Sequence, residues 1–216
     1  AMRKLFCKMG GGSVDPAGIR GCLSDLLLDN IHRSIRKDTI INFLALHGVQ
    51  RRDWAIDKTV NERIAAIYEM YYESLHSQLV NDTFIEIPGS ASILGSDGLP
   101  IDHKVLLIGE AGAGKSCSLA MTINKLTNHG VPVLPIRFDN LPDGILSTTE
   151  LGQKLGLPES PTVVLSSIAE GKPCIMVIDQ LDAMSIVSGR RTELWNLFDL
   201  LRREVEKIPN FYMLIG

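Results

Sequence analysis

Residues 109–116 constrain this chain most, because they read Gly-Glu-Ala-Gly-Ala-Gly-Lys-Ser. The spacing is that of a G-x-x-x-x-G-K-[ST] loop. An apolar run at 105–108 precedes the loop and a helix-like stretch at 117–126 follows it, which is the strand–loop–helix context that the motif requires. Glycines let the backbone curl so that successive N–H groups can point at a phosphate, and the following helix adds its N-terminal dipole. The loop therefore predicts a phosphate-binding site at the start of a helix.

The residue types in this loop indicate a nucleotide as the phosphate-bearing ligand. Lys115 can reach the β- and γ-phosphates, and the Ser116 hydroxyl can bind Mg²⁺. The predicted cofactor-binding residues are Gly109, Glu110, Ala111, Gly112, Ala113, Gly114, Lys115, Ser116 and Cys117. The expected cofactors are ATP or ADP together with Mg²⁺.

A second motif occupies 174–182 and reads Cys-Ile-Met-Val-Ile-Asp-Gln-Leu-Asp. Its apolar run is typical of a strand buried on both faces, and Asp179 ends that strand. Ligands of open α/β sheets bind at the carboxyl ends of strands, so Asp179 is the expected Walker B carboxylate and, with Ser116, a predicted metal ligand. Asp182 is a candidate for orienting or deprotonating the attacking water, although helix N-caps also favour Asp. Lys115, Asp179 and Asp182 are the predicted catalytic residues.

Composition narrows the class of protein further. The chain has 216 residues, 45% of them hydrophobic, and a formal net charge of −3, so no global basic field indicates a nucleic-acid partner. No apolar run is long enough for a transmembrane helix, and the start lacks the apolar segment of a signal peptide. The cysteines are scattered, at Cys7, Cys22, Cys117 and Cys174, as expected of reduced thiols in a cytoplasmic protein.

Residues 1–83 carry helical signals and are predicted to form an independent helical N-terminal module. Asp15 is the predicted N-cap of one helix, and Asp38 is that of a second helix stopped by Gly48. Asp53 is the predicted N-cap of the third and longest helix. That helix carries an apolar stripe expected to pack in a core, made of Val60, Ile64, Ile67, Tyr68, Tyr71, Leu75 and Leu79.

Residues 84–102 are the predicted linker, because the stretch 88–100 is rich in Gly, Pro and Ser. A short strand is predicted just before that stretch, at 83–87. From 103 to 216 the pattern alternates between strand and helix, which predicts an α/β domain with a parallel sheet. The expected strands are 104–108, 132–138, 174–178 and 211–215, and the expected helices are 114–128, 148–155, 161–170 and 191–206.

The part of the chain from about Ile85 to Gly216 resembles the STAND class of P-loop ATPases, near the NACHT and AAA-like branches. The residues that carry the resemblance are 106–116, 132–137 and 177–182. One strand lies between the loop strand and the Asp179 strand in the sequence, which in P-loop folds typifies the additional-strand division that includes AAA-like ATPases. Because the chain ends on a buried-strand pattern, we expect a domain that is incomplete at its C-terminus.

The resemblance implies an ATP- and Mg²⁺-binding domain of a signalling switch, in which the nucleotide state gates conformation and assembly. Such switches join an N-terminal effector to the ATPase, a winged-helix unit and a C-terminal sensor, and several bacterial ones serve in phage defence. Protein partners or self-assembly are therefore expected of the full-length chain. The chain departs from the family pattern at Gln180, where a small residue is common, and at Ala183, where a Glu is typical. These departures bear on hydrolysis more than on binding. We expect weak ATPase activity or none from this fragment, because the family's γ-phosphate sensor and winged-helix unit would lie beyond Gly216.

Two other functions remain open at this point. A nucleic-acid-dependent AAA ATPase would require a basic or aromatic loop, and none stands out. A nucleotide-binding scaffold without useful turnover is favoured by the missing Glu at position 183. Among single residues, Arg190 and Arg191 are either an arginine finger or surface charges, His103 is interpreted as structural, and Asp139 is a candidate for the water or metal shell.

Overall fold

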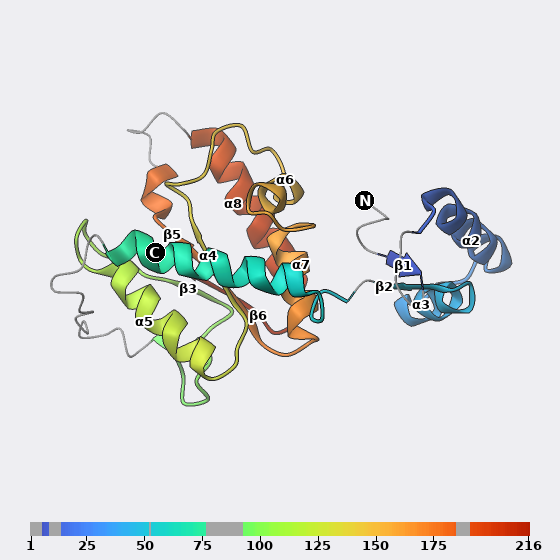
Figure 1. The fold of residues 1–216 in the computed structure, drawn as a ribbon, viewed down its shortest axis with the longest axis horizontal. Helices are drawn as coiled ribbons and strands as arrows, with labels where there is room; N and C mark the ends of the chain where they lie inside the picture. The colour runs from blue at the N-terminus through green and yellow to red at the C-terminus, as the bar shows by residue number, and fades with distance from the viewer. Residues whose placement is uncertain (1–5, 9–13, 52, 77–92, 185–190) are drawn as a thin grey trace. The chain divides into compact units, whose positions relative to one another are not determined.

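The computed structural model describes residues 6–8, 14–51, 53–76, 93–184 and 191–216. The chain divides into two compact units, 1–53 and 54–216. Figure 1 shows the elements of each unit.

The first unit combines two helices with a two-stranded antiparallel sheet. Strand β1 (Phe6–Lys8) pairs with β2 (Val49–Arg51), and between them in the chain come α2 (Pro16–Asp29) and α3 (Lys37–Leu46). The core of the unit is small, with Val14, Ile19 and Leu44 buried. The predicted cap of the first helix is confirmed, because the Asp15 carboxylate accepts hydrogen bonds from the backbone N–H groups of Ala17 and Gly18, both at 3.1 Å.

The predicted caps of the other two helices are wrong. Arg36 occupies the N-cap position of α3, so Asp38 lies in the first turn instead, although Gly48 follows the helix with a φ of 70° as expected. The longest helix, α4 (Lys58–His76), begins after Asp57, whose carboxylate accepts from the N–H groups of Thr59 and Val60 at 3.1 and 3.3 Å. Asp53 stands too early in the chain to reach those amides. A cap requires an acceptor within reach of the N2 and N3 amides, and of the two acidic residues shortly before α4 it is Asp57 that accepts from them.

The second unit contains a four-stranded parallel sheet, which confirms the predicted α/β class. The strand order is β3-β6-β5-β4, and every neighbouring pair is parallel. The strands are β3 (Lys104–Leu106), β4 (Val133–Arg137), β5 (Cys174–Asp179) and β6 (Phe211–Ile215). Strand β6, and not β4, therefore separates β3 from β5 in the sheet. The short strand predicted at 83–87 lies outside the described residues.

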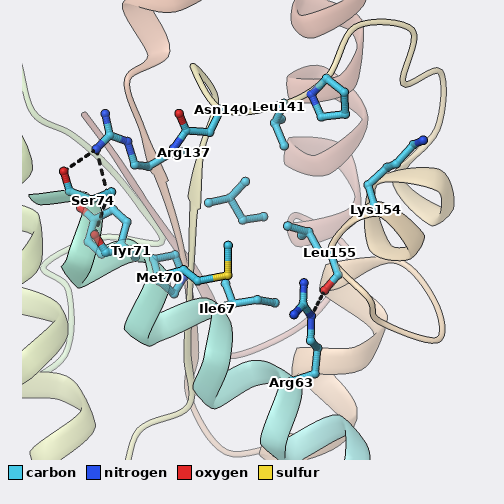
Figure 2. A pocket seen from close by; sticks show the side chains of 13 residues that line it. Arg63, Ile67, Met70, Tyr71, Ser74, Arg137, Asn140, Leu141, Lys154 and Leu155 are labelled. Atoms are coloured by element: carbon cyan, nitrogen blue, oxygen red, sulfur yellow. Dashed lines mark hydrogen bonds between the residues drawn. The ribbon is translucent and has the colours of Figure 1, made fainter.

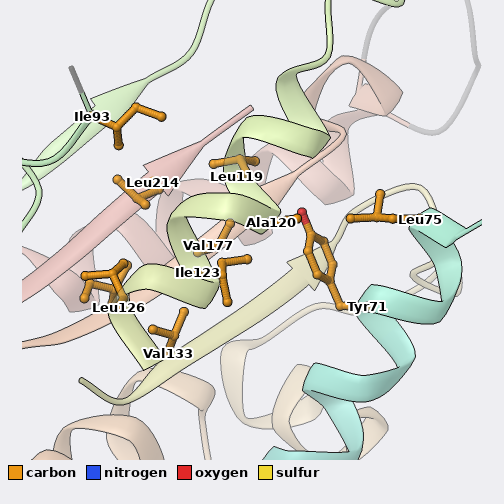
Figure 3. Packing of buried hydrophobic residues seen from close by; sticks show 11 residues of the cluster. Tyr71, Leu75, Ile93, Leu119, Ala120, Ile123, Leu126, Val133, Val177 and Leu214 are labelled. Carbon is orange, nitrogen blue, oxygen red and sulfur yellow. The ribbon is translucent and has the colours of Figure 1, made fainter. Parts of the chain in front are cut away.

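Helices cover the sheet in two groups (Figure 1). Helix α4 packs with α5 (Lys115–Asn128), and α6 (Thr148–Lys154), α7 (Pro161–Ala169) and α8 (Arg191–Val205) pack together. Figure 3 shows the core under the first group. There the sheet residues Val133, Ile175, Val177 and Leu214 meet Leu119, Ile123 and Leu126 of α5 and Tyr71 and Leu75 of α4.

The predicted boundary at residue 83 differs from the structure, which divides the chain between Asp53 and Trp54. Helix α4 belongs to the second unit, because its apolar stripe is buried against β4 and α5. The described end of the predicted linker also belongs there. Ile93 is buried in the same core, and Leu94 forms a β-bridge with Pro100. The described part of the stripe was correctly expected to be core, but it packs on the sheet and not in a separate helical module. Leu79, the last residue of the predicted stripe, lies outside the described residues.

None of the helices within the described ranges is both long and apolar enough to cross a lipid bilayer.

Candidate functional site

The loop before α5 has the backbone that its glycines permit. Gly112 and Gly114 have φ values of 79° and 77°, a conformation that residues with a Cβ rarely adopt. Helix α5 begins at the next residue, Lys115, so the loop leads directly into the N-terminus of a 14-residue helix. The Lys115 ammonium donates to the carbonyl oxygens of Gly109 and Glu110 at 3.0 and 3.3 Å. The loop therefore places a cation and a helix N-terminus at one point, as anion binding requires.

The two sequence motifs meet through a hydrogen bond between side chains. The Ser116 hydroxyl donates to Asp179 Oδ1 at 3.0 Å, across 63 positions of the chain. Asp179 ends β5 and is only 1% exposed. Gln180, the next residue, donates its backbone N–H to the same Oδ1 at 2.9 Å and its side-chain amide to Ser116 Oγ at 3.3 Å. The predicted metal ligands thus lie side by side.

A cavity of about 320 Å³ lies over these groups. Its lining residues are Ala111, Gly112, Ala113, Gly114, Lys115, Ser116, Cys117, Asp179, Gln180, Asp182 and Gly216. All three predicted catalytic residues are among them. Of the predicted cofactor-binding residues, Gly109 and Glu110 do not line the cavity; they contribute the carbonyl oxygens that hold Lys115. Asp182 lies on the 3₁₀ turn Leu181–Met184 and is exposed at the cavity.

The donors present fit Mg²⁺. Within the described ranges, no three His, Cys, Asp or Glu side chains gather in a way that could hold a metal ion by themselves. Mg²⁺ does not need such a cage, because it keeps several waters and uses one or two protein oxygens plus substrate phosphates. One hydroxyl and one carboxylate oxygen, 3.0 Å apart beside a phosphate-type loop, form a donor set of that kind.

Two residues of this site were missed by the sequence reasoning. Tyr71 on α4 donates its hydroxyl to Asp179 Oδ2 at 3.1 Å. Burial, together with the charge of Asp179 and this hydrogen bond, raises the pKa of Tyr71 far above its usual range, so the phenol remains a donor. Gln180, interpreted from sequence as a departure from a family pattern, has a φ of 61° and contacts both metal-ligand candidates. The position of Gln180 directly after Asp179 could have indicated that it belongs to the site. Nothing in the sequence connected Tyr71 to Asp179, which lies 108 positions away.

The remaining candidates have other surroundings. Asp139 forms an ion pair with Arg137 at 2.7 Å and does not line the cavity, so it is not placed with the metal ligands. His103 stacks on Tyr212 with ring centroids 4.9 Å apart, in keeping with a structural role. Arg190 and the side chain of Arg191 lie outside the described part of the chain.

A second cavity, of about 220 Å³, lies between α4 and the segment that follows β4 (Figure 2). Its walls are largely apolar, with Ile67, Met70 and Leu141 among them, and Arg63 and Lys154 also line it. The Arg63 side chain is held in place by its hydrogen bond to the Leu155 carbonyl oxygen at 2.5 Å. This second cavity is lined by α4 itself, and the first is lined by Asp179, which Tyr71 of α4 contacts.

Comparison with known proteins gave no match to any family model, curated protein or solved structure.

Proposed function

We propose that this chain binds ATP or ADP with Mg²⁺ in the cavity over residues 111–117. The observation that carries the proposal is the hydrogen bond between Ser116 Oγ and Asp179 Oδ1. Ser116 belongs to the loop motif and Asp179 to the strand motif, and both are predicted ligands of one magnesium ion. Their oxygen atoms lie 3.0 Å apart at the N-terminus of α5. A chance glycine-rich turn has no reason to face a buried carboxylate at a strand end.

In this proposal each group has one task. The Lys115 ammonium leaves the carbonyl oxygens of Gly109 and Glu110 and contacts the phosphates. Ser116 and Asp179 hold the metal ion, which when bound neutralises charge on the phosphate oxygens. Asp182, exposed at the same cavity, orients or deprotonates the water that attacks the terminal phosphate.

The wider proposal is that the domain is the P-loop ATPase of a STAND-like cytoplasmic switch, whose nucleotide state gates assembly with itself or with protein partners. The strand order supports it. In the sheet one strand, β6, lies between the strand before the loop and the strand that ends at Asp179, although it is not the strand that separates them in the sequence. A shift between two states needs a ligand with different affinities for them, and the groups near the terminal phosphate supply that difference.

Calorimetric titration with ATP and ADP in Mg²⁺ buffer tests the binding proposal. Lys115→Ala removes the cation nearest the phosphates and is expected to weaken binding by about 2–3 kcal/mol. Lys172→Ala is the matched control. Lys172 is exposed and precedes β5, at the end of the strand opposite Asp179, so its replacement should leave the affinity unchanged. Equal affinity of the wild type and Lys115→Ala would contradict the proposal.

A further inference from the structure

The carboxylate of Asp179 is held from three directions. Tyr71 on α4 donates to Oδ2, while Ser116 at the start of α5 and the backbone N–H of Gln180 both donate to Oδ1. The carboxylate is almost completely buried, so these protein donors and not bulk water decide its orientation. With Oδ2 fixed by Tyr71, Oδ1 is turned toward Ser116.

The Tyr71 hydroxyl is in turn fixed by the packing of α4. Tyr71 is 4% exposed, and its ring points from α4 toward α5 in the core shown in Figure 3. The neighbouring Tyr72 attaches the same turn to α5, because its hydroxyl donates to the Ala120 carbonyl oxygen at 2.6 Å. The two rings contact edge to face, with centroids 6.1 Å apart. A movement of α4 away from α5 would therefore withdraw the Tyr71 donor from Asp179.

A second chain of contacts joins this part of α4 to the end of β4. The Ser74 hydroxyl donates to the Tyr71 carbonyl oxygen at 2.6 Å and accepts from Arg137 at 2.9 Å. Arg137 is itself held by its ion pair with Asp139. Figure 2 shows Arg137 reaching Ser74 on α4 beside the cavity between α4 and the segment after β4. Contacts with α5 and with the end of β4 thus hold the part of α4 that carries Tyr71.

We propose that Tyr71 is a positioning residue for the metal-binding carboxylate, so that the Mg²⁺-dependent part of nucleotide affinity depends on the docking of α4. This inference rests on the proposed function. Removing the hydroxyl leaves Oδ2 buried without this donor, and the carboxylate can turn away from Ser116. Because coupling between two sites is reciprocal, bound Mg²⁺-nucleotide must also hold α4 in place.

The test compares the affinity for ADP in Mg²⁺ with that in EDTA, for the wild type, Tyr71→Phe and Tyr212→Phe. The ratio of the two affinities cancels any general change in the fold. In Tyr71→Phe the ratio is expected to fall about tenfold, the loss of one hydrogen bond to a charged group, while the affinity in EDTA stays at the wild-type value. Tyr212→Phe removes a hydroxyl from β6, where the ring stacks on His103 and takes no part in the docking of α4, so its ratio should equal that of the wild type.

Hydrogen exchange of wild-type α4 provides a measurement that needs no variant. Amides around Tyr71 should exchange more slowly with Mg²⁺-ADP than with ADP in EDTA. The positioning role is overturned if Tyr71→Phe leaves the affinity ratio unchanged or raises it, or if the amide exchange rates of α4 are the same with and without Mg²⁺. Either result leaves the proposal of wild-type nucleotide binding intact. A wild type that binds no ADP in either buffer overturns this inference and the proposed function together.

Discussion

At the scale of single residues, Cys117 and Cys174 differ in their burial. Cys117 is partly exposed and lines the cavity over the loop, whereas Cys174 begins β5 and is buried on a strand with no exposed position. Burial raises the pKa of the Cys174 thiol to about 12, from an ordinary value of 9.0. A thiol must ionise before it can act as a nucleophile. Chemical reactivity therefore depends on location in the sheet and not on residue type.

Cys174 should resist alkylation in the folded protein. With iodoacetamide at pH 8, peptide mass spectrometry is expected to find Cys174 unmodified until denaturant is added, and Cys117 modified without it. The raised pKa also has a consequence for stability. Below about pH 9 this thiol does not change the free energy of unfolding, because it is neutral in both the folded and the unfolded state. As the pH rises from 9 toward 12, the thiol ionises only in the unfolded state, so the free energy of unfolding falls. Rapid labelling of Cys174 in the native state would show that β5 is not buried in solution.

At the scale of elements, one carboxylate joins the three helices α6, α7 and α8. Glu204 on α8 accepts hydrogen bonds from Thr148 at 2.5 Å, from Ser160 at 2.6 Å and from Thr162. The three hydroxyl residues are buried and lie at the starts of α6 and α7. A buried polar group without a partner is costly, so this arrangement specifies how the N-termini of α6 and α7 dock on α8.

Glu204→Ala should destabilise the second unit by about 2–4 kcal/mol, because three buried hydroxyls lose their shared acceptor. The measurement is urea unfolding followed by tryptophan fluorescence, and Trp195 on α8 reports on the same helix. Glu206→Ala is the matched control. Glu206 is exposed just after the end of α8, where it pairs with Lys104 and Arg202, and its loss should matter much less. If both variants unfold at the same urea concentration, Glu204 does not hold the helices together.

At the scale of the whole molecule, α4 decides where the second unit begins. Four of its apolar side chains are buried, at Val60, Ile67, Tyr71 and Leu75. Burial of such side chains contributes about 1.5–3 kcal/mol each, so α4 supplies about 6–12 kcal/mol as an upper estimate. That is comparable to the entire net stability of an ordinary domain, about 5–15 kcal/mol. The unit should therefore not fold without this helix.

A chain of residues 54–216 should unfold cooperatively, and a chain of residues 84–216 should not. The first keeps α4 with its sheet and core, whereas the second begins at the boundary expected from sequence and exposes the face of α5 and β4 that α4 covers. Thermal unfolding followed by circular dichroism distinguishes them. A sharp transition in the shorter chain would restore the sequence-based boundary and show that α4 is an addition to a complete domain.

The local features of this protein were predictable because they depend on neighbours in the chain. The ends of several elements were predicted to within one or two residues, since apolar periodicity extends along each element. These elements are the strands 133–137 and 174–179 and the helices 115–128 and 191–205. The phosphate-type loop was recognisable because its glycines and lysine are consecutive. The cap of α4 was misplaced, because two acidic residues, Asp53 and Asp57, stand shortly before that helix and only geometry shows which one reaches its amides.

By itself the sequence determined the α/β class of the second unit and the loop at 109–116. It also predicted that this loop and Asp179 belong to one site. Only the tertiary structure decided that β6 lies between β3 and β5, that α4 belongs with the sheet, and that Tyr71 contacts Asp179. The physical reason is the range of the interactions. Secondary structure and loop chemistry follow from residues a few positions apart, whereas strand order and side-chain contacts across 108 positions depend on how complete elements pack.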